Sequence, residues 1–339
     1  MNGAGGRREP VTAWPDGWLQ IKVPLPFSLR WVNAYLLPEP GGGWTLIDPG
    51  LHTEEAVALW EAVLKERRIG FGSIERIVLT HQHPDHYGLA GWFQERSGAP
   101  VYMSRAARDY TLRLWGPKRS FETDLNALFK AHGMPDVLRE GIAGHLESFV
   151  AKVSPQPAVD FIEAGGRIAM NGLDWETIAA PGHARGQLLF YQRESKRIIC
   201  GDQVLPRITP NIGLVPGPDE ESNPLRAFLD HLTELAMYDV KLAFPGHRDP
   251  FPNFADRIAE LIAHHERRLQ EIAAMLAEPL TGYEVCIRLF GARIADDMHH
   301  LRFAMAETLA HLVELEAAGA AVRTEQGGVA RFRAAANIY

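Results

Sequence analysis

Three histidines and one aspartate are crowded into the stretch HQHPDH, which runs from His81 to His86. They follow the apolar run Ile77-Val78-Leu79, which is typical of a buried strand. Imidazole and carboxylate groups are costly to bury unless they are paired or bind a metal. The stretch therefore predicts a metal site at the end of a strand.

Four further strand-like runs also end in a residue that can bind a metal or orient a ligand. The runs are WTLI, ETIAA, RIIC and VKLAF. Ligands of α/β sheets bind at the carboxyl ends of the strands, so a shared sheet edge would bring these residues together. The residues at these ends are Asp48, His183, Asp202 and His247.

The spacing of the ligands predicts two metal ions. Pro84 favours an extended backbone at His83, which should direct the side chains around it to different sides. Ligands restricted to His and Asp suit zinc and also iron or manganese, so we expect two divalent ions, with zinc as the first choice. We assign His81, His83 and His183 to one ion and Asp85, His86 and His247 to the other, with Asp202 bridging them.

Two such ions predict hydrolytic chemistry. A single zinc ion already lowers the pKa of a bound water to about 7, so a shared water should be held as hydroxide near neutral pH. This hydroxide would attack a carbonyl or phosphoryl centre while the ions polarise the electrophilic oxygen and stabilise the leaving atom. We assign catalytic roles to Asp85 and Asp202, which hold these ions.

The elements that must position these residues alternate along the chain. LQIKVPL, NAYLLP and WTLID are predicted strands and EEAVALWEAVLKERR a predicted helix, a pattern that builds a layered α/β domain. Helical patterns without strands at about 104–150 predict an inserted cover. We divide the chain into a catalytic domain, 1–254, and a C-terminal region, 255–339. In the C-terminal region, a linker helix is followed by two more helices and a hairpin that turns at Gly327-Gly328. This order is winged-helix-like.

Composition indicates an ordinary globular protein. The 339 residues are 46% hydrophobic and 23% charged, and the net charge of −7 gives no general attraction for nucleic acid. Cys200 and Cys286 are too few for a disulfide framework, and no apolar stretch approaches the 18 residues that a membrane span needs. The start of the chain lacks the apolar run of a secretory signal, so we expect a cytoplasmic protein with a frayed N-terminus.

In the order HQHPDH, PGHARG, GDQVL and PGHRDP, these motifs resemble those of the metallo-β-lactamase superfamily. The preceding VNAYLL and LIDPG extend the resemblance over about residues 19–252. The resemblance implies an αββα sandwich with a dinuclear site at its edge and the same seven ligands. It also implies that Asp48 lies behind the ligands and orients one of them.

Departures from the patterns of the superfamily narrow the expected reaction. An aspartate bridge without a secretion signal argues against a β-lactamase. Gln203-Val204-Leu205 stands where quorum-sensing lactonases carry a tyrosine, and Arg248-Asp249-Pro250 replaces the acidic and aromatic residues of glyoxalase II. The layout is most similar to the lactamase-beta-2-like and glyoxalase II-like group, some of which cleave single-stranded RNA. We expect an ester, thioester or lactone hydrolase; the alternatives are a single-stranded RNA or phosphodiester hydrolase and a metal-binding regulatory protein.

The C-terminal region bears on the choice of partner. Residues 255–339 contain nine arginines and no lysine against twelve acidic residues, whereas nucleic-acid contacts need cations. We therefore favour a small-molecule substrate, with no membrane contact, and a tail that forms a homodimer or partly covers the site.

Two sets of residues are candidates for substrate contacts. Beside the motifs, Arg207 is a candidate for an anionic group and Asn211 for an oxyanion, and loop capping is the alternative for both. Tyr87 is a third candidate. We expect the helical insertion to set specificity, although its apolar residues fit a core better than a pocket. They are Trp115, Phe121, Phe129 and Met134.

Overall fold

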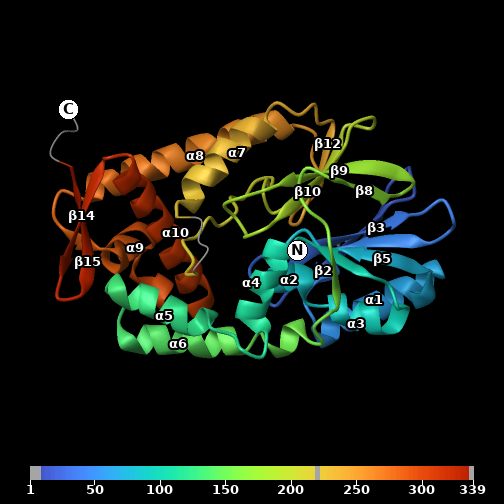
Figure 1. Ribbon diagram of the computed structural model, residues 1–339, viewed down its shortest axis with the longest axis horizontal. Helices are drawn as coiled ribbons and strands as arrows, with labels where there is room; N and C mark the ends of the chain where they lie inside the picture. Colours follow the sequence, from blue (N-terminus) through green and yellow to red (C-terminus); the bar gives the residue numbers. More distant parts are fainter. Residues whose placement is uncertain (1–8, 218–221, 336–339) are drawn as a thin grey trace, which may run out of the picture.

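Two β-sheets face each other at the centre of the larger part of the molecule (Figure 1). The computed structural model describes residues 9–217 and 222–335, so the first eight residues of the predicted frayed N-terminus lie outside the described residues. The first sheet has seven strands in chain order and the second five, in the order β12-β11-β10-β9-β8. The first comprises β1 (Val11–Ala13), β2 (Leu19–Pro24), β3 (Trp31–Pro38), β4 (Trp44–Ile47), β5 (Ile74–Val78), β6 (Val101–Met103) and β7 (Val159–Phe161). The second comprises β8 (Arg167–Met170), β9 (Leu173–Ala179), β10 (Leu188–Gln192), β11 (Arg197–Gly201) and β12 (Leu242–Pro245).

The central strands of each sheet are buried on both faces. On β3, Tyr35 belongs to the apolar core between the sheets, whereas its neighbour Leu36 belongs to the core on the outer face. On β10, Phe190 and Leu189 divide in the same way. Because successive side chains of a strand point to opposite faces, a strand that is covered on both sides has a continuous apolar sequence.

Helices cover the outer faces and complete the predicted αββα sandwich. Helices α1 (Glu54–Arg67) and α3 (Ala90–Ser97) pack on the seven-stranded sheet, while α7 (Pro224–Leu235) and α8 (Phe254–Met275) lie beyond the five-stranded sheet (Figure 1). Helix α1 begins where the Thr53 side chain accepts a hydrogen bond from the Ala56 amide. This cap and the acidic residues of the first turn stabilise the start of the helix.

The carboxyl ends of several strands meet at one edge of the sandwich. Strand β5 runs parallel to β4, and β12 runs parallel to β11, so the loops that follow them leave in the same direction. The loop after β5 leads into the short helix α2 (Pro84–Tyr87). Its preceding residue, His83, is extended with φ −60° and ψ 145°, as Pro84 predicts.

The predicted insertion is helical and lies beside the C-terminal region (Figure 1). It consists of α4 (Arg105–Trp115), α5 (Phe121–Ala131) and α6 (Asp136–Glu147). Helix α6 packs against α10 (Met298–Ala317), and α5 contacts β15 (Val329–Ala334). The insertion therefore connects the sandwich to the tail.

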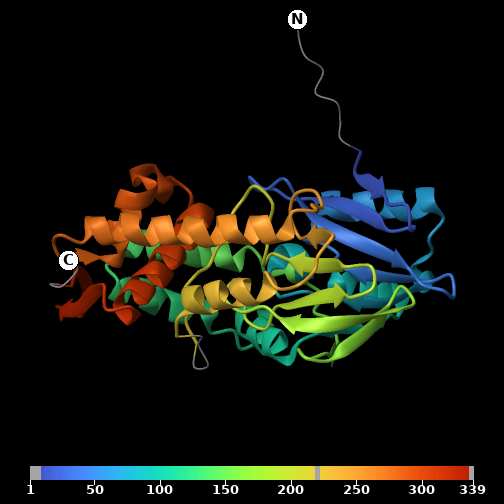
Figure 2. The same ribbon diagram turned by 90° about the horizontal axis from the view of Figure 1, so that it is seen from above.

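The tail contains the predicted order of helix, helix and hairpin. After β13 (Leu280–Thr281) come α9 (Gly282–Phe290), α10, β14 (Ala321–Gln326) and β15. Gly327 and Gly328 form the hairpin turn with φ values of 60° and 76°, which suit glycine. Helix α10 also packs against α7 and α8, and α8 runs from the sandwich to the tail in Figure 2. One apolar core continues from the sandwich into α10, which joins the two regions firmly.

Among the described residues, no helix is both long and apolar enough to span a lipid bilayer.

Candidate metal centre and pocket

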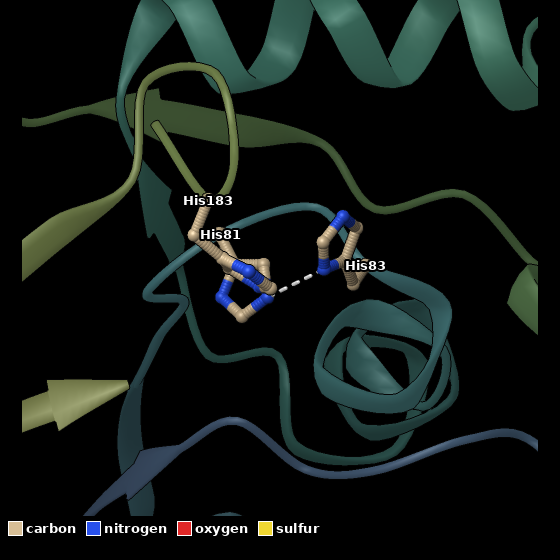
Figure 3. Close-up of side chains that lie close together, drawn as sticks. All are labelled: His81, His83 and His183. Atoms are coloured by element: carbon tan, nitrogen blue, oxygen red, sulfur yellow. Dashed lines mark hydrogen bonds between the residues drawn. The ribbon is translucent and has the colours of Figure 1, made fainter. Parts of the chain in front are cut away.

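The seven predicted ligands lie together at the sheet edge. Figure 3 shows three of them, with the rings of His81, His83 and His183 close to one another. The Nε2 atom of His81 lies 3.0 Å from Nδ1 of His83. Three groups bring their ligand atoms within 4.8 Å of one another: His81, His83 and His183; His81, His86 and Asp202; and Asp85, His86 and His247.

Asp202 lies between the two predicted ligand sets. Its Oδ2 atom is 3.6 Å from Nε2 of His183 and 3.3 Å from Nε2 of His247. Its Oδ1 atom is 3.4 Å from Nε2 of His86. One carboxylate thus contacts histidines of both sets, which is the placement that a bridging ligand needs.

Asp48 holds the backs of the ligand imidazoles. His86 donates a hydrogen bond from Nδ1 to Asp48 over 2.8 Å, and Thr80 donates to the same carboxylate from its amide and its hydroxyl. The Thr80 oxygen in turn accepts from Nδ1 of His81 at 2.9 Å. Because these Nδ1 atoms donate within the protein, Nε2 is the ring atom that each histidine would offer to a metal.

Backbone carbonyl groups hold two more ligands in the same tautomer. His183 donates from Nδ1 to the carbonyl oxygen of Asn211 over 2.9 Å. His247 donates from Nδ1 to the carbonyl oxygen of Trp31 over 3.0 Å. Both side chains therefore present Nε2 to the centre. Histidines that bind metals commonly donate their second nitrogen in this way.

The two predicted ligand sets differ in the effect that carboxylates have on the pKa values of their histidines. Burial and the neighbouring His183 lower the pKa of His83 to about 3. Burial acts in the same direction on His247, but Asp202 and Asp85 outweigh it and raise the pKa of His247 to about 10. The pKa of His86 is raised for the same reason. The carboxylates therefore make the second half strongly attractive to positive charge.

The residues fit a pair of cations. The Nε2 atoms of His86 and His183 and the Oδ1 atom of Asp202 are buried and have no hydrogen-bond partner among the described residues. Buried acceptors without donors are costly, and a metal ion satisfies them. The backbone leaves room for this arrangement, because a side chain at Gly246 would collide with Asp202 and His86.

A pocket of about 350 Å³ opens from the centre. Besides the ligand loops of the sandwich, the lining includes the loop after β2, the helical insertion, the loop of residues 205–216 and the first turns of α10. Most of its side chains are apolar or aromatic, as in most small-molecule sites. The aromatic lining includes Phe27, Tyr110, Trp115, Phe121, Phe149 and Phe303.

The three residues predicted to contact substrate lie in different places relative to the pocket. Tyr87 is buried and its hydroxyl donates to Gln156 over 2.7 Å, while Arg207 is exposed; neither lines the pocket that the described residues enclose. Asn211 lines the pocket, but its amide nitrogen donates to Glu307 and to the Phe303 carbonyl oxygen, so the donor is used within the protein. This contact fits the loop-capping alternative.

The helical insertion contributes residues both to the apolar core and to the wall of the pocket. Trp115 and Phe121 line the pocket, while Phe129 and Met134 are buried elsewhere. From α10, Arg302 and Phe303 also line it. Sequence reasoning missed these two, because the pattern of α10 fits a packed helix. The signal that could have found them was a charged residue within the buried half of that helix.

Comparisons with known proteins agree with this geometry. The family model of the Metallo-beta-lactamase superfamily matches residues 30–247, and that of the Metallo-beta-lactamase-like C-terminal domain matches residues 269–335. The crystal structure of metallo-beta-lactamase family protein TTHA1429 from Thermus thermophilus is 33% identical and covers 95% of this chain and 99% of its own, with a TM-score of 0.83.

Two curated relatives carry names that refer to hydrolysis. "Probable metallo-hydrolase YqjP" of Bacillus subtilis is 27% identical over 93% of this chain and 97% of its own length. The "Atrochrysone carboxyl ACP thioesterase" of Pseudocercospora fijiensis is 21% identical over 81% of this chain and 67% of its own length.

Proposed function

Because the chain belongs to the metallo-beta-lactamase superfamily and is a metallo-hydrolase, we propose that it hydrolyses esters, thioesters or lactones with a dinuclear metal centre. The observation that carries this proposal is the convergence of the ligand groups on one apolar pocket. The name of the thioesterase relative supports an acyl substrate. Zinc remains our first choice of metal, with iron and manganese as alternatives.

The seven ligands have the assignments made from the sequence. Two divalent ions in such a site supply a water that is deprotonated near neutral pH and polarise the oxygen under attack. The protein itself orients the imidazoles through Asp48 and the two carbonyl groups, and it keeps their Nε2 lone pairs toward the centre. In this proposal, His81, His83 and His183 hold one ion, Asp85, His86 and His247 hold the other, and Asp202 contacts both.

The wall of the pocket favours acyl substrates over nucleic acid. Its aromatic side chains can bind an acyl or aryl body and exclude water from it. A phosphodiester backbone would instead need several cations along an open surface. The net negative charge of residues 255–339 acts against such binding. The tail serves as a wall of the pocket in this proposal.

An activity panel on protein of measured metal content tests the proposal. The panel contains a thioester, a lactone, an aryl ester, an aryl phosphodiester and single-stranded RNA. We expect turnover of acyl substrates in proportion to the metal content, and loss of turnover on chelation. Cleavage of the phosphodiester or RNA alone would contradict the proposal, and metal binding without any turnover would favour the regulatory alternative.

A further inference from the structure

We propose that the pocket selects a small acyl substrate with an anionic group, which the guanidinium of Arg302 binds while the apolar body lies on the aromatic wall. This inference rests on the proposed function, since it names the chemical class of that substrate. It assigns a binding role to the C-terminal region, which contributes Arg302 from α10.

Arg302 is a cation in an apolar place. Its Nε atom is buried and has no hydrogen-bond partner among the described residues. Its guanidinium carbon lies 4.0 Å from the ring centroid of Phe303, which also lines the pocket. Burial lowers the pKa of Arg302 to about 10, so the group stays charged at neutral pH although its surroundings disfavour the charge. A bound anion would relieve this cost.

The other arginines of the pocket are already engaged. Arg113 forms an ion pair with Asp124, with Nη2 and Oδ2 2.9 Å apart. Arg185 also has an interaction partner. Arg302 forms no ion pair with a carboxylate of the described residues, which sets it apart from Arg113. Its charge is therefore available to a ligand.

The nearby histidines do not compensate or replace this charge. Burial, followed by the charges of Arg302 and His145, lowers the pKa of His299 to about 4, so this imidazole is neutral at pH 7. His300 is exposed and pairs with Asp297, with Nδ1 and Oδ2 2.9 Å apart. Arg302 is thus the strongest candidate in the lining for an anionic group.

The aromatic wall next to this cation is continuous. The ring of Phe27 stacks on His299 with centroids 4.6 Å apart, and it lies 5.7 Å from the ring of Phe149. Phe149 in turn lies 6.3 Å from Trp115. Stacked and tilted rings at these separations offer a surface for an acyl or aryl body. A ligand that contacts both features must combine an apolar body with an anionic group.

A matched pair of fluorescent dyes tests the inference without any turnover. The sulfonate 8-anilinonaphthalene-1-sulfonate and its neutral parent N-phenyl-1-naphthylamine share an aromatic body and differ in the anionic group. They are titrated into the metal-loaded full-length protein, into Arg302→Gln and Arg302→Met, and into the control Arg293→Gln. Arg293 is exposed in the same region, so its replacement removes the same charge away from the pocket.

We expect the Arg302 variants to weaken sulfonate binding about 10-fold or more, because a charge-assisted hydrogen bond is lost, and to leave binding of the neutral dye unchanged. Arg293→Gln should leave both affinities unchanged. Equal weakening of both dyes, or sulfonate binding that is unchanged in the Arg302 variants, overturns the inference. Circular dichroism checks the fold, and Arg302→Met retains the apolar stem if the glutamine variant does not fold.

A kinetic arm links the inference to the proposed function. Two 4-nitrophenyl esters of one dicarboxylic acid are compared, one with a free carboxylate and one with that carboxylate capped as a methyl ester. We expect Arg302→Gln to raise KM for the free acid about 10-fold and to lower kcat/KM for the capped ester much less than kcat/KM for the free acid. If neither ester is hydrolysed, the proposed function fails, whereas the dye titration still decides the role of Arg302.

Discussion

Buried histidines occur in two regions of this molecule, and their surroundings differ. At the sheet edge, Asp85 and Asp202 contact His247 and raise its pKa. Between α8 and α10, His265 donates from Nδ1 to Nε2 of His311 over 3.2 Å. Burial and then the positive charges of neighbouring groups lower the pKa of His265 to about 3, and no carboxylate of the described residues contributes to the shift.

Neighbouring carboxylates distinguish the metal centre from the structural pair His265 and His311. Carboxylates beside imidazoles create a site with excess negative charge, which a cation neutralises. A histidine pair without carboxylates is stable only while both rings are neutral, so it acts as a polar part of the core. Both regions contain buried histidines, but only those at the sheet edge have carboxylates that raise a histidine pKa.

Removing the bridging carboxylate should have the largest effect. Asp202→Asn removes the negative charge shared by both halves, so we expect about one metal per chain by elemental analysis and a loss of kcat/KM of about 10³-fold or more. Asp174→Asn is the matched control, because Asp174 is exposed on β9 of the same sheet. Full metal content and full activity of Asp202→Asn would remove the assignment of Asp202 as the bridge.

Asp48→Asn tests the carboxylate behind the ligands. Asp48 has a φ of 48°, which asparagine tolerates, so the backbone should be retained. The amide would donate to Nδ1 of His86, which moves the imidazole proton to Nε2 and blocks that lone pair. We expect a loss of metal affinity of about 10- to 100-fold in a chelator competition. An affinity equal to that of Asp174→Asn would show that Asp48 does not fix the tautomer.

The histidine pair predicts a smaller effect on stability. Because the pKa of His265 is about 3 in the folded state and about 6.5 when unfolded, the unfolded state binds the proton first. The free energy of unfolding is therefore unaffected above pH 6.5 and falls as the pH drops toward 3. At pH 5, His265 accounts for a loss of about 2 kcal/mol in the free energy of unfolding.

Urea unfolding of the wild type and His265→Leu at pH 7.5 and pH 5 measures this loss. The variant should lose less stability between the two values than the wild type, by about 2 kcal/mol. The measurement at pH 7.5 is the internal control, because both states keep the histidine neutral there. Equal losses in the two proteins would mean that His265 is protonated in the folded state.

The sequence predicted the parts of the centre that depend on short spacing. His81, His83, Asp85 and His86 lie in one motif, and strand ends placed the other ligands at the same edge. The acceptors of His183 and His247 could not be predicted, because they are backbone carbonyl groups that only the folded chain brings near.

The residues that form the wall of the pocket also could not be predicted from the sequence. Arg302 lies about two hundred residues from the first ligand motif, and only the packing of α10 on α6 and α7 brings it to the pocket. The anionic contact expected of Arg207 is therefore proposed for a residue of the tail. In our proposal, local motifs supply the ligands of the metal centre, whereas contacts between distant segments build the pocket that selects the substrate.

Asn211 connects the metal centre to α10, and its replacement should have the smallest effect on stability and activity. Its carbonyl oxygen holds His183, while its amide donates to Glu307 on α10 over 3.0 Å. Asn211→Ala keeps the carbonyl group and removes only the link to α10. We expect a loss of about 1 kcal/mol in the free energy of unfolding. The value of kcat should stay within about 2-fold, since a side-chain contact outside the reaction does not change transition-state binding.

Asn253→Ala is the matched control for this substitution. Asn253 is exposed and its side chain does not cap α8, so its replacement should change neither stability nor kcat. If the Asn211 amide donated to an oxyanion instead, kcat would fall about 10²-fold without a change in stability. Measuring both quantities on the two variants therefore decides whether Asn211 belongs to the reaction or to the contact that holds α10 against the pocket.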